Sequence, residues 1–178
     1  TYSGGTTING GTMLIDGSIA GGTVNVASGA TLGGAGSVGG SVIVSGTVAP
    51  GDAGVGKLTT GSETWNSRGV ELFELNNATN SAGWDSLNIN GTLNFQGILG
   101  KFTIYLVTLT SGNTPGPVAG FANGNTYAWT VATASGGIEN FNPAVIAVDA
   151  TGFDNAFNGT FSVATNGNSL LVIYTPGP

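Results

Sequence analysis

The chain has 178 residues, of which 33 are glycine, with a formal net charge of −6 and neither cysteine nor histidine. Only three residues are basic, so the sequence has no cluster of Lys and Arg that would bind nucleic acid or an anionic membrane surface. The lack of cysteine excludes a disulfide scaffold and thiolate metal sites. Charged residues make up 7% of the chain, far below the roughly 25% of ordinary soluble domains.

The first third of the chain repeats a pattern of a polar residue, a glycine, a threonine and an aliphatic residue. The pattern occurs at residues 9–14, 28–32 and 45–48, with a period near 20 residues. Between these repeats, residues 23–26 and 41–44 place valines two positions apart, which is the period of a half-buried strand. The sequence therefore predicts a glycine-rich β-solenoid over residues 1–66, which indicates a scaffold rather than a catalyst.

From residue 67 the apolar runs lengthen and aromatic residues concentrate. We therefore expect an aromatic-rich β domain over residues 67–178 that shares a continuous core with the solenoid. The turn cluster at residues 50–54 indicates a boundary nearby. The second part either caps the solenoid as a sandwich-like sheet or continues it with wider rungs. Its candidate strands are residues 70–75, 86–89, 92–95, 101–109, 126–133, 144–148, 160–164 and 169–175.

Two Asn-Gly pairs, Asn90-Gly91 and Asn166-Gly167, lie between candidate strands. Asn-Gly is the sequence most typical of a type I′ β-hairpin turn. We therefore predict two hairpins and a partly antiparallel second half.

Residues 2–15, continued by residues 29–36 and 48–51, resemble the autotransporter-associated β-strand repeat. Residues 84–93 are similar to the segment that comes after the repeat in these proteins, and residues 169–176 resemble the region before the Pro-Glu-Pro sorting signal of exosortase-processed proteins. The chain starts inside the repeat pattern, and we interpret it as a processed, mature piece. The resemblance implies a secreted β-solenoid at a bacterial cell surface, and it supplies no catalytic residues.

Two glycine motifs match nucleotide-binding patterns only in their letters. Residues 34–39 read G-x-G-x-x-G, but a strand follows where a dinucleotide site needs a helix. Residues 51–57 approach the phosphate-binding loop, but Leu58 stands where that loop has a magnesium-binding hydroxyl. We interpret both segments as solenoid corners.

The nine carboxylates predict no catalytic pair. Glu71 and Glu74 are three apart on a candidate strand, so they point to opposite faces. Asp149 and Asp154 flank a turn around Gly152, where they are either Ca²⁺ ligands or caps of their own backbone. We therefore expect no enzyme activity and no cofactor, with Ca²⁺ as the one candidate ion.

The aromatic residues allow two interpretations. The three tryptophans (Trp65, Trp84 and Trp129) and the tyrosines either form a sugar-stacking platform or pack in the core, and core packing is favoured. The sequons at Asn77, Asn90 and Asn158 permit glycosylation but arise readily in a chain rich in Asn and Thr.

The leading functional hypothesis is a structural subunit of an extracellular bacterial filament or surface layer. An uncapped solenoid end presents a row of unpaired backbone groups, and residues 1–8 contain no Pro, Lys or Glu to block pairing. We expect the segment of Tyr2, Thr6, Thr7 and Ile8 to add to the sheet of another copy, head to tail. The alternative is a monomeric surface adhesin or carbohydrate-binding module with a glycan partner. A polysaccharide-degrading solenoid ranks third.

Overall fold

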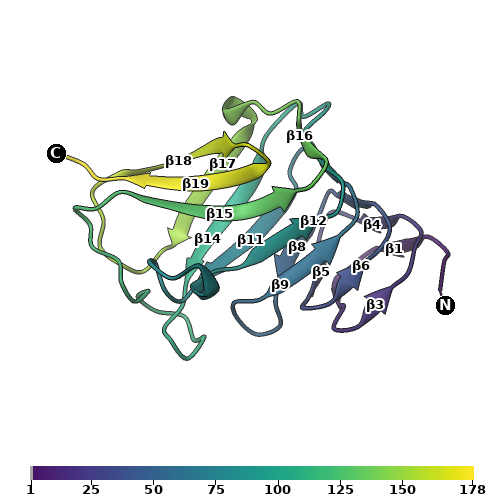
Figure 1. Ribbon diagram of the computed structural model, residues 1–178, viewed down its shortest axis with the longest axis horizontal. Coiled ribbons are helices and arrows are strands. Elements are labelled where there is room, and N and C mark those ends of the chain that lie inside the picture. The colour runs from purple at the N-terminus through teal and green to yellow at the C-terminus, as the bar shows by residue number, and fades with distance from the viewer. Residues whose placement is uncertain (1) are drawn as a thin grey trace.

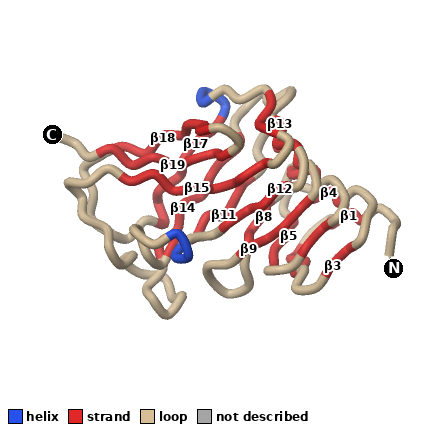
Figure 2. The backbone as a smooth tube through the Cα atoms, viewed as in Figure 1, coloured by secondary structure: helices blue, strands red, loops and turns tan. Residues whose placement is uncertain are grey.

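The computed structural model describes residues 2–178, and in it the chain is all-β (Figure 1). Within these residues, nineteen strands form three sheets, and the only helices are two short 3₁₀ turns (Figure 2). These turns are η1 (Ser81–Gly83) and η2 (Pro143–Val145). The strands succeed one another along the long axis of the molecule, so that the first strands and the last strands lie at opposite ends.

The three sheets are named A, B and C here, and each takes every third strand of the chain up to β17. Sheet A contains β1 (Thr6–Ile8), β4 (Val24–Val26), β7 (Val42–Val44), β10 (Glu63–Trp65), β13 (Thr92–Asn94) and β16 (Gly137–Glu139). Sheet B contains β2 (Gly11–Leu14), β5 (Ala30–Gly34), β8 (Thr47–Pro50), β11 (Val70–Leu75), β14 (Phe102–Thr108) and β17 (Ile146–Gly152). Sheet C contains β3 (Ser18–Ile19), β6 (Ser37–Val38), β9 (Lys57–Thr60), β12 (Ser86–Ile89), β15 (Tyr127–Ala134), β19 (Ser169–Thr175) and β18 (Thr160–Asn166), in that order.

Three consecutive strands, one from each sheet, make one rung. The rungs β1–β3, β4–β6, β7–β9, β10–β12 and β13–β15 stack with all neighbouring strands parallel. This all-β architecture with parallel sheets fits the predicted β-solenoid.

The register stacks like side chains on one another. In sheet A, Val24 pairs with Val42, and both are buried, so that the two-residue alternation seen in the sequence points valine inward. On the outer face of sheet B, Thr12 pairs with Thr31, which pairs with Thr47. Each rung therefore contributes a layer of aliphatic side chains to one continuous core.

A column of glycines forms the corner between sheets C and A, where the chain of one rung touches the chain of the next. A Cβ atom on Gly22 would overlap the carbonyl oxygen of Gly4, one on Gly40 would overlap that of Gly22, and one on Gly61 would overlap that of Gly40. Only glycine permits an approach this close at the strand spacing of about 4.8 Å. The glycine repeat in the sequence thus has a packing cause as well as a turn-forming one.

The three sheets run across the expected division at residues 66 and 67. Strands β11 and β14 are longer than the strands of the first three rungs, and within residues 2–178 the buried aromatic side chains occur only from Trp65 onward. The ring of Trp65 stacks on that of Phe102, with centroids 4.1 Å apart. Because β10 to β17 join the same sheets as β1 to β9, the second part continues the solenoid with wider rungs as far as β17.

An antiparallel hairpin ends the molecule, as the second half was predicted to be partly antiparallel. Strand β19 pairs antiparallel with both β15 and β18. The loop between β18 and β19 is Gly167-Asn168, one residue later than predicted, because Asn166 pairs with Ser169. Only Gly167 has a positive φ, which fits a type II′ turn rather than the predicted type I′.

Two other local predictions are wrong. Asn90-Gly91 is not a hairpin turn, because β12 lies in sheet C and β13 lies in sheet A, so that the pair forms a corner. The turn cluster at residues 50–54 comprises the last residue of β8 and part of the loop that leads to β9, inside the third rung. The strand expected over residues 144–148 begins at Ile146, because Pro143 starts a 3₁₀ turn capped by the Asn142 side chain.

We expect Gly40→Ala to lower the free energy of unfolding by about 3 kcal/mol, because the added methyl group has no space beside the Gly22 backbone. Gly21→Ala is the matched control, since a Cβ atom there has no neighbour within 4 Å. Urea unfolding followed by circular dichroism measures both. Equal stability of the two variants would contradict the corner packing.

Candidate functional site

The N-terminal end of the solenoid is an open sheet edge formed by β1, β2 and β3. Among the described residues, each of these strands has a neighbouring strand on one side only. In β1, the N–H of Thr6 donates to Thr23 and the carbonyl of Ile8 accepts from Ala27, so the backbone groups of Thr7 between them face away from β4.

The other two edge strands follow the same alternation. In β2, the N–H of Ile15 donates to Gly33. The backbone N–H and carbonyl groups of Thr12 and Leu14 therefore point away from β5, toward the open edge of the sheet. In β3, the carbonyls of Gly17 and Ile19 accept from the N–H groups of Ser37 and Gly39. The backbone groups of Ser18 therefore point away from β6, toward the open edge of the sheet. The open N-terminal edge is therefore Thr7, Thr12, Leu14 and Ser18.

The residues predicted for assembly are only partly brought together. Thr6, Thr7 and Ile8 make up β1, but only Thr7 presents free backbone groups, and the Ile8 side chain is buried in the core. Tyr2 is 56% exposed, and its hydroxyl donates to the carbonyl of Gly5, 2.7 Å away. The sequence reasoning missed Thr12, Leu14 and Ser18, which become edge residues only because β2 and β3 lie in the same rung as β1.

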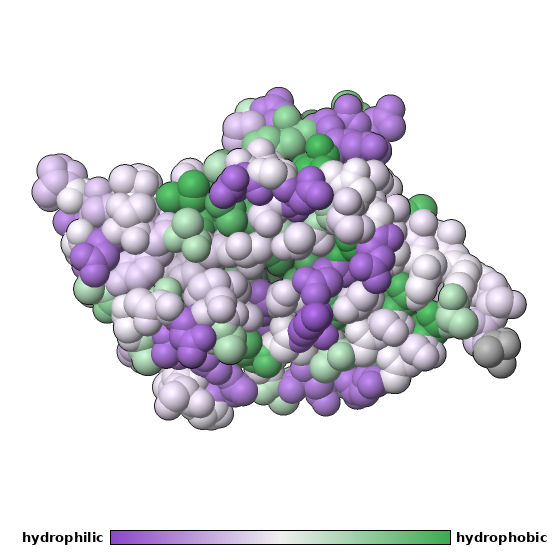
Figure 3. Space-filling model, in the orientation of Figure 1, coloured by the Kyte–Doolittle hydropathy of each residue, from purple (hydrophilic) through white to green (hydrophobic). Residues whose placement is uncertain are grey.

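Apolar side chains at both ends of the core are only partly covered. Met13 and Ile19 lie on the first rung, and Ile138 and Val148 lie on the last strands of sheets A and B. Green apolar surface is visible close to the N-terminal end in Figure 3. Covering these side chains would add hydrophobic stabilisation at about 25 cal/mol per Å².

The C-terminal end differs from the N-terminal end, because its sheet B edge is irregular. Strand β17 has a register shift opposite residues 105 and 107 of β14, and the bulge follows Asp149. The carboxylate of Asp149 accepts hydrogen bonds from the N–H and the hydroxyl of Thr151, at 3.0 and 2.7 Å. Edge bulges and charges of this kind discourage further strand pairing beyond them.

The interior of the fourth rung contains two buried acidic side chains that the sequence did not predict to be buried. Glu63 takes a position in the sheet A ladder between Val42 and Leu93, and Glu71 takes one in the sheet B ladder between Val48 and Ile104. The expectation that Glu71 and Glu74 face opposite sides is confirmed, because Glu74 is half-exposed on the outer face. No strand periodicity distinguishes these acids from an aliphatic residue at the same position.

The two buried acids differ in how well they are hydrogen-bonded. The Glu63 carboxyl accepts from the hydroxyl of Thr60 at 2.8 Å and from the indole N–H of Trp65 at 2.7 Å. Burial raises the pKa of Glu63 to about 7, and these two hydrogen bonds offset part of the rise. Neither oxygen of Glu71 has a hydrogen-bond partner within residues 2–178. Burial, together with repulsion from Glu63 and Asp85, raises the pKa of Glu71 well above its usual value.

Asp85 is the third buried acid, and its carboxyl group is hydrogen-bonded to the backbone of two other segments. Its two carboxyl oxygens accept from the N–H groups of Gly56 and Glu74, each at 2.8 Å. Burial raises the pKa of Asp85 to about 8 in spite of these two hydrogen bonds. Within residues 2–178, no three acidic side chains come together to hold a metal ion.

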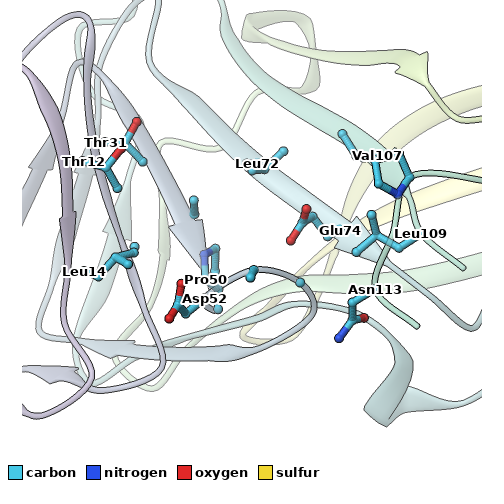
Figure 4. Close-up of a pocket in the computed structure, with 16 residues that line it drawn as sticks. Thr12, Leu14, Thr31, Pro50, Asp52, Leu72, Glu74, Val107, Leu109 and Asn113 are labelled. Carbon is cyan, nitrogen blue, oxygen red and sulfur yellow. The ribbon is translucent and has the colours of Figure 1, made fainter. Parts of the chain in front are cut away.

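A shallow groove of about 420 Å³ crosses the outer face of sheet B. In Figure 4, Leu14 lies at one end of the groove and Asn113 at the other, with Asp52 between them. Leu72 and Val107 form part of an apolar floor, and burial raises the pKa of the adjoining Glu74. The groove combines an apolar surface with carboxyl and amide groups, which is a combination that can bind small polar molecules.

The aromatic and glycosylation candidates fall in different environments. Trp65 and Trp129 are fully buried, so the core interpretation is right for them, whereas Trp84 is half-buried beside Lys57 in a small surface hollow. Among the sequons, Asn90 and Asn158 are exposed. The Asn77 side chain accepts from the backbone of Thr79 and Asn80, which caps a turn.

The nucleotide-like motifs and the Ca²⁺ candidates have structural explanations. Residues 34–39 lead from β5 into β6, and residues 51–57 lead from β8 into β9, so a strand rather than a helix follows each motif. The Asp149 carboxylate caps Thr151, and these hydrogen bonds lower its pKa. Asp154 is anchored through its N–H, which donates to the Thr108 hydroxyl at 2.9 Å.

No protein-family model matches the chain, and no curated protein matches it in sequence. The resemblance to the autotransporter-associated β-strand repeat therefore stays a prediction. Within residues 2–178, no helix is long and apolar enough to cross a membrane.

The raised pKa values predict that stability falls as pH rises. An acid with a raised folded-state pKa favours folding below its unfolded value near 4.5, and this contribution is lost as pH rises through the folded value. We therefore expect the free energy of unfolding to decrease between pH 4 and pH 8, the window set by Glu63 and Asp85. Urea unfolding at a series of pH values measures this decrease, and a flat profile would contradict it.

We expect Glu71→Leu to raise the free energy of unfolding at pH 8 by about 2 kcal/mol, because it removes a buried acid that has no partner. The gain should shrink at pH 4, where the acid is neutral in both states. Glu74→Leu on the outer face of the same strand is the control. A Glu71→Leu variant that is less stable than the parent at pH 8 would show that the carboxyl group is needed for folding.

Proposed function

We propose that this protein is a structural subunit of an extracellular bacterial filament or surface layer, and that copies assemble head to tail through the open N-terminal edge. The observation that carries the proposal is the unpaired backbone of Thr7, Thr12, Leu14 and Ser18 on three sheets at once. An edge with no bulge, proline or lysine in its strands is a template for pairing with another chain.

One further feature supports head-to-tail pairing over pairing of two N-terminal ends. The half-covered apolar side chains occur at both ends of the core, so that one contact between unlike ends covers both sets. Contacts between unlike surfaces are heterologous and give open filaments unless the rotation closes a ring. A structural subunit needs no catalytic site. The acidic side chains of the fourth rung are buried in the core and do not line a cleft.

The alternative, a monomeric adhesin or carbohydrate-binding module, rests on the groove over sheet B. Its Asp52, Glu74 and Asn113 side chains could hydrogen-bond sugar hydroxyls above the apolar floor. Glycan-array binding that disappears in an Asn113→Ala variant would favour this alternative over the filament.

We expect Thr7→Pro to weaken assembly about tenfold, because it removes a free N–H at the edge and places a ring where the next strand would pair. The fold should be retained, since within residues 2–178 the alternation along β1 points this N–H away from β4, its one partner strand. Thr7→Val is the matched control, because it keeps the N–H and the side-chain shape. Negative-stain electron microscopy at neutral pH, with sedimentation to quantify polymer, measures the effect.

Two results would overturn the proposal: parent protein that stays monomeric under these conditions, or Thr7→Pro filaments as abundant as those of Thr7→Val. Removing residues 1–10 is a weaker test, because the loss of β1 exposes β4 as a new and equally regular edge.

A further inference from the structure

At the C-terminal end of the molecule, sheet C has one more strand than sheets A and B. Sheets A and B each have six strands and end at β16 and β17, whereas sheet C has seven and ends at β18. Strand β19 lies between β15 and β18, so it fills the place of a sixth strand in sheet C. Sheet C therefore extends one strand, about 4.8 Å, beyond the other two.

The last strands keep the direction of the rungs. Strand β19 is antiparallel to β15, and β18 is antiparallel to β19, so β18 runs in the same direction as β15. Strands β16, β17 and β18 thus cross sheets A, B and C in the order and direction in which β1, β2 and β3 cross them. The C-terminal end offers parallel edges to a following copy.

The ladders set the register of such a contact in sheets A and B. Ile138 ends the inward ladder that runs from Thr6 through Val24, Val42, Glu63 and Leu93. Ala147 ends the outward ladder that runs from Thr12 through Thr31, Thr47, Val70 and Thr103. Continuing both ladders places Thr6 of the following copy beside Ile138 and Thr12 beside Ala147.

The lengths of the paired segments agree with this register in sheet B. With Thr12 beside Ala147, the four residues of β2 lie along residues 146–149, which form the regular part of β17 before its bulge. Met13 then lies beside Val148, and both of these half-covered apolar side chains become buried. The bulge of β17 begins where β2 ends, so it does not obstruct the contact.

Sheet C cannot accept the following copy in the same way, because its next position is already filled. If β1 and β2 extend sheets A and B by one strand, β3 of the following copy falls on the position that β18 holds. Strand β3 has two residues and, as far as residues 2–178 show, pairs only with β6, whereas β18 has seven residues. The inner side of β18 carries Phe161 and Val163, which are only partly buried.

We infer that head-to-tail assembly exchanges one strand in sheet C: β18 of one copy replaces β3 of the following copy and pairs with β6 of that copy. The inference rests on the proposed function. Phe161 and Val163 then cover Val38 of the following copy in place of Ile19. Because β6 has two residues, the new pairing is as long as the one that it replaces. What the exchange adds is that all three sheets run continuously through the junction.

An engineered disulfide that holds β3 against β6, and that can be reduced again, tests the exchange. The sequence has no native cysteine, so the two introduced cysteines can pair only with each other within one copy. Ser18 and Ser37 are register partners in β3 and β6, so a Ser18→Cys/Ser37→Cys variant can hold β3 in place by a disulfide. We expect the oxidised variant to polymerise at least about tenfold less than the reduced variant. The control is Lys57→Cys/Ser86→Cys, a register pair of β9 and β12 inside the same sheet, which should polymerise equally in both states.

The outcomes separate the exchange from the proposed function. If the oxidised variant polymerises as well as the reduced protein, β3 stays in place and the exchange is wrong, while the filament proposal stands. If neither the parent protein nor the reduced variant polymerises, the filament proposal itself fails.

Mixing two single-cysteine proteins tests the register. Oxidising Thr12→Cys protein together with Ala147→Cys protein should give a crosslinked dimer that neither protein forms alone. Dimers of Thr12→Cys alone would show pairing of two N-terminal ends and overturn the head-to-tail contact. Filaments that form without the mixed dimer would overturn the register.

Discussion

Each rung of this protein is held by backbone hydrogen bonds to the rung before it and the rung after it. The strand spacing of about 4.8 Å is therefore imposed on every part of the chain, including the corners. At the corner between sheets C and A, where a Cβ atom on Gly40 would overlap the backbone of Gly22, this spacing can be met only by glycine. Side-chain ladders, the linear core and the high glycine content all follow from this stacking.

The same constraint makes the two ends of the molecule the places where unpaired backbone groups collect. At the N-terminal end, three regular strands present free N–H and carbonyl groups beside half-covered Met13 and Ile19. At the C-terminal end, the bulge in β17 and the β18–β19 hairpin make the edge uneven. The ends are thus unlike but run in the same direction, which is the geometry of a repeating contact rather than a closed pair.

In the fourth rung, the strand register places two acidic side chains in the core. Glu63 and Glu71 occupy ladder positions that hold valine in the preceding rung. Glu63 is compensated by Trp65 and Thr60, whereas Glu71 has no comparable partner. The rung that carries both acids lies where the interior begins to widen around Trp65 and Phe102. An unpaired neutral acid is costly to bury, so this rung is where the stack depends most on pH.

The sequence by itself determined the fold class, because a two-residue alternation of valine with polar residues and a glycine-rich repeat leave few alternatives to stacked strands. It also located β11, β12 and β19 to the residue, since each is bounded by glycine, asparagine or proline nearby. The tertiary structure decided the features that depend on contacts between distant residues. Asn90-Gly91 became a corner because each of its flanking strands found a partner in a different sheet.

The candidate site divides in the same way. Thr6, Thr7 and Ile8 could be named as an edge because they lie near the start of the repeat pattern. The sequence does not show that Thr12, Leu14 and Ser18 share this edge. It also does not show that sheet C extends beyond sheets A and B. Both facts depend on which strands become neighbours, and pairing between strands far apart in the chain leaves no local signal in the sequence.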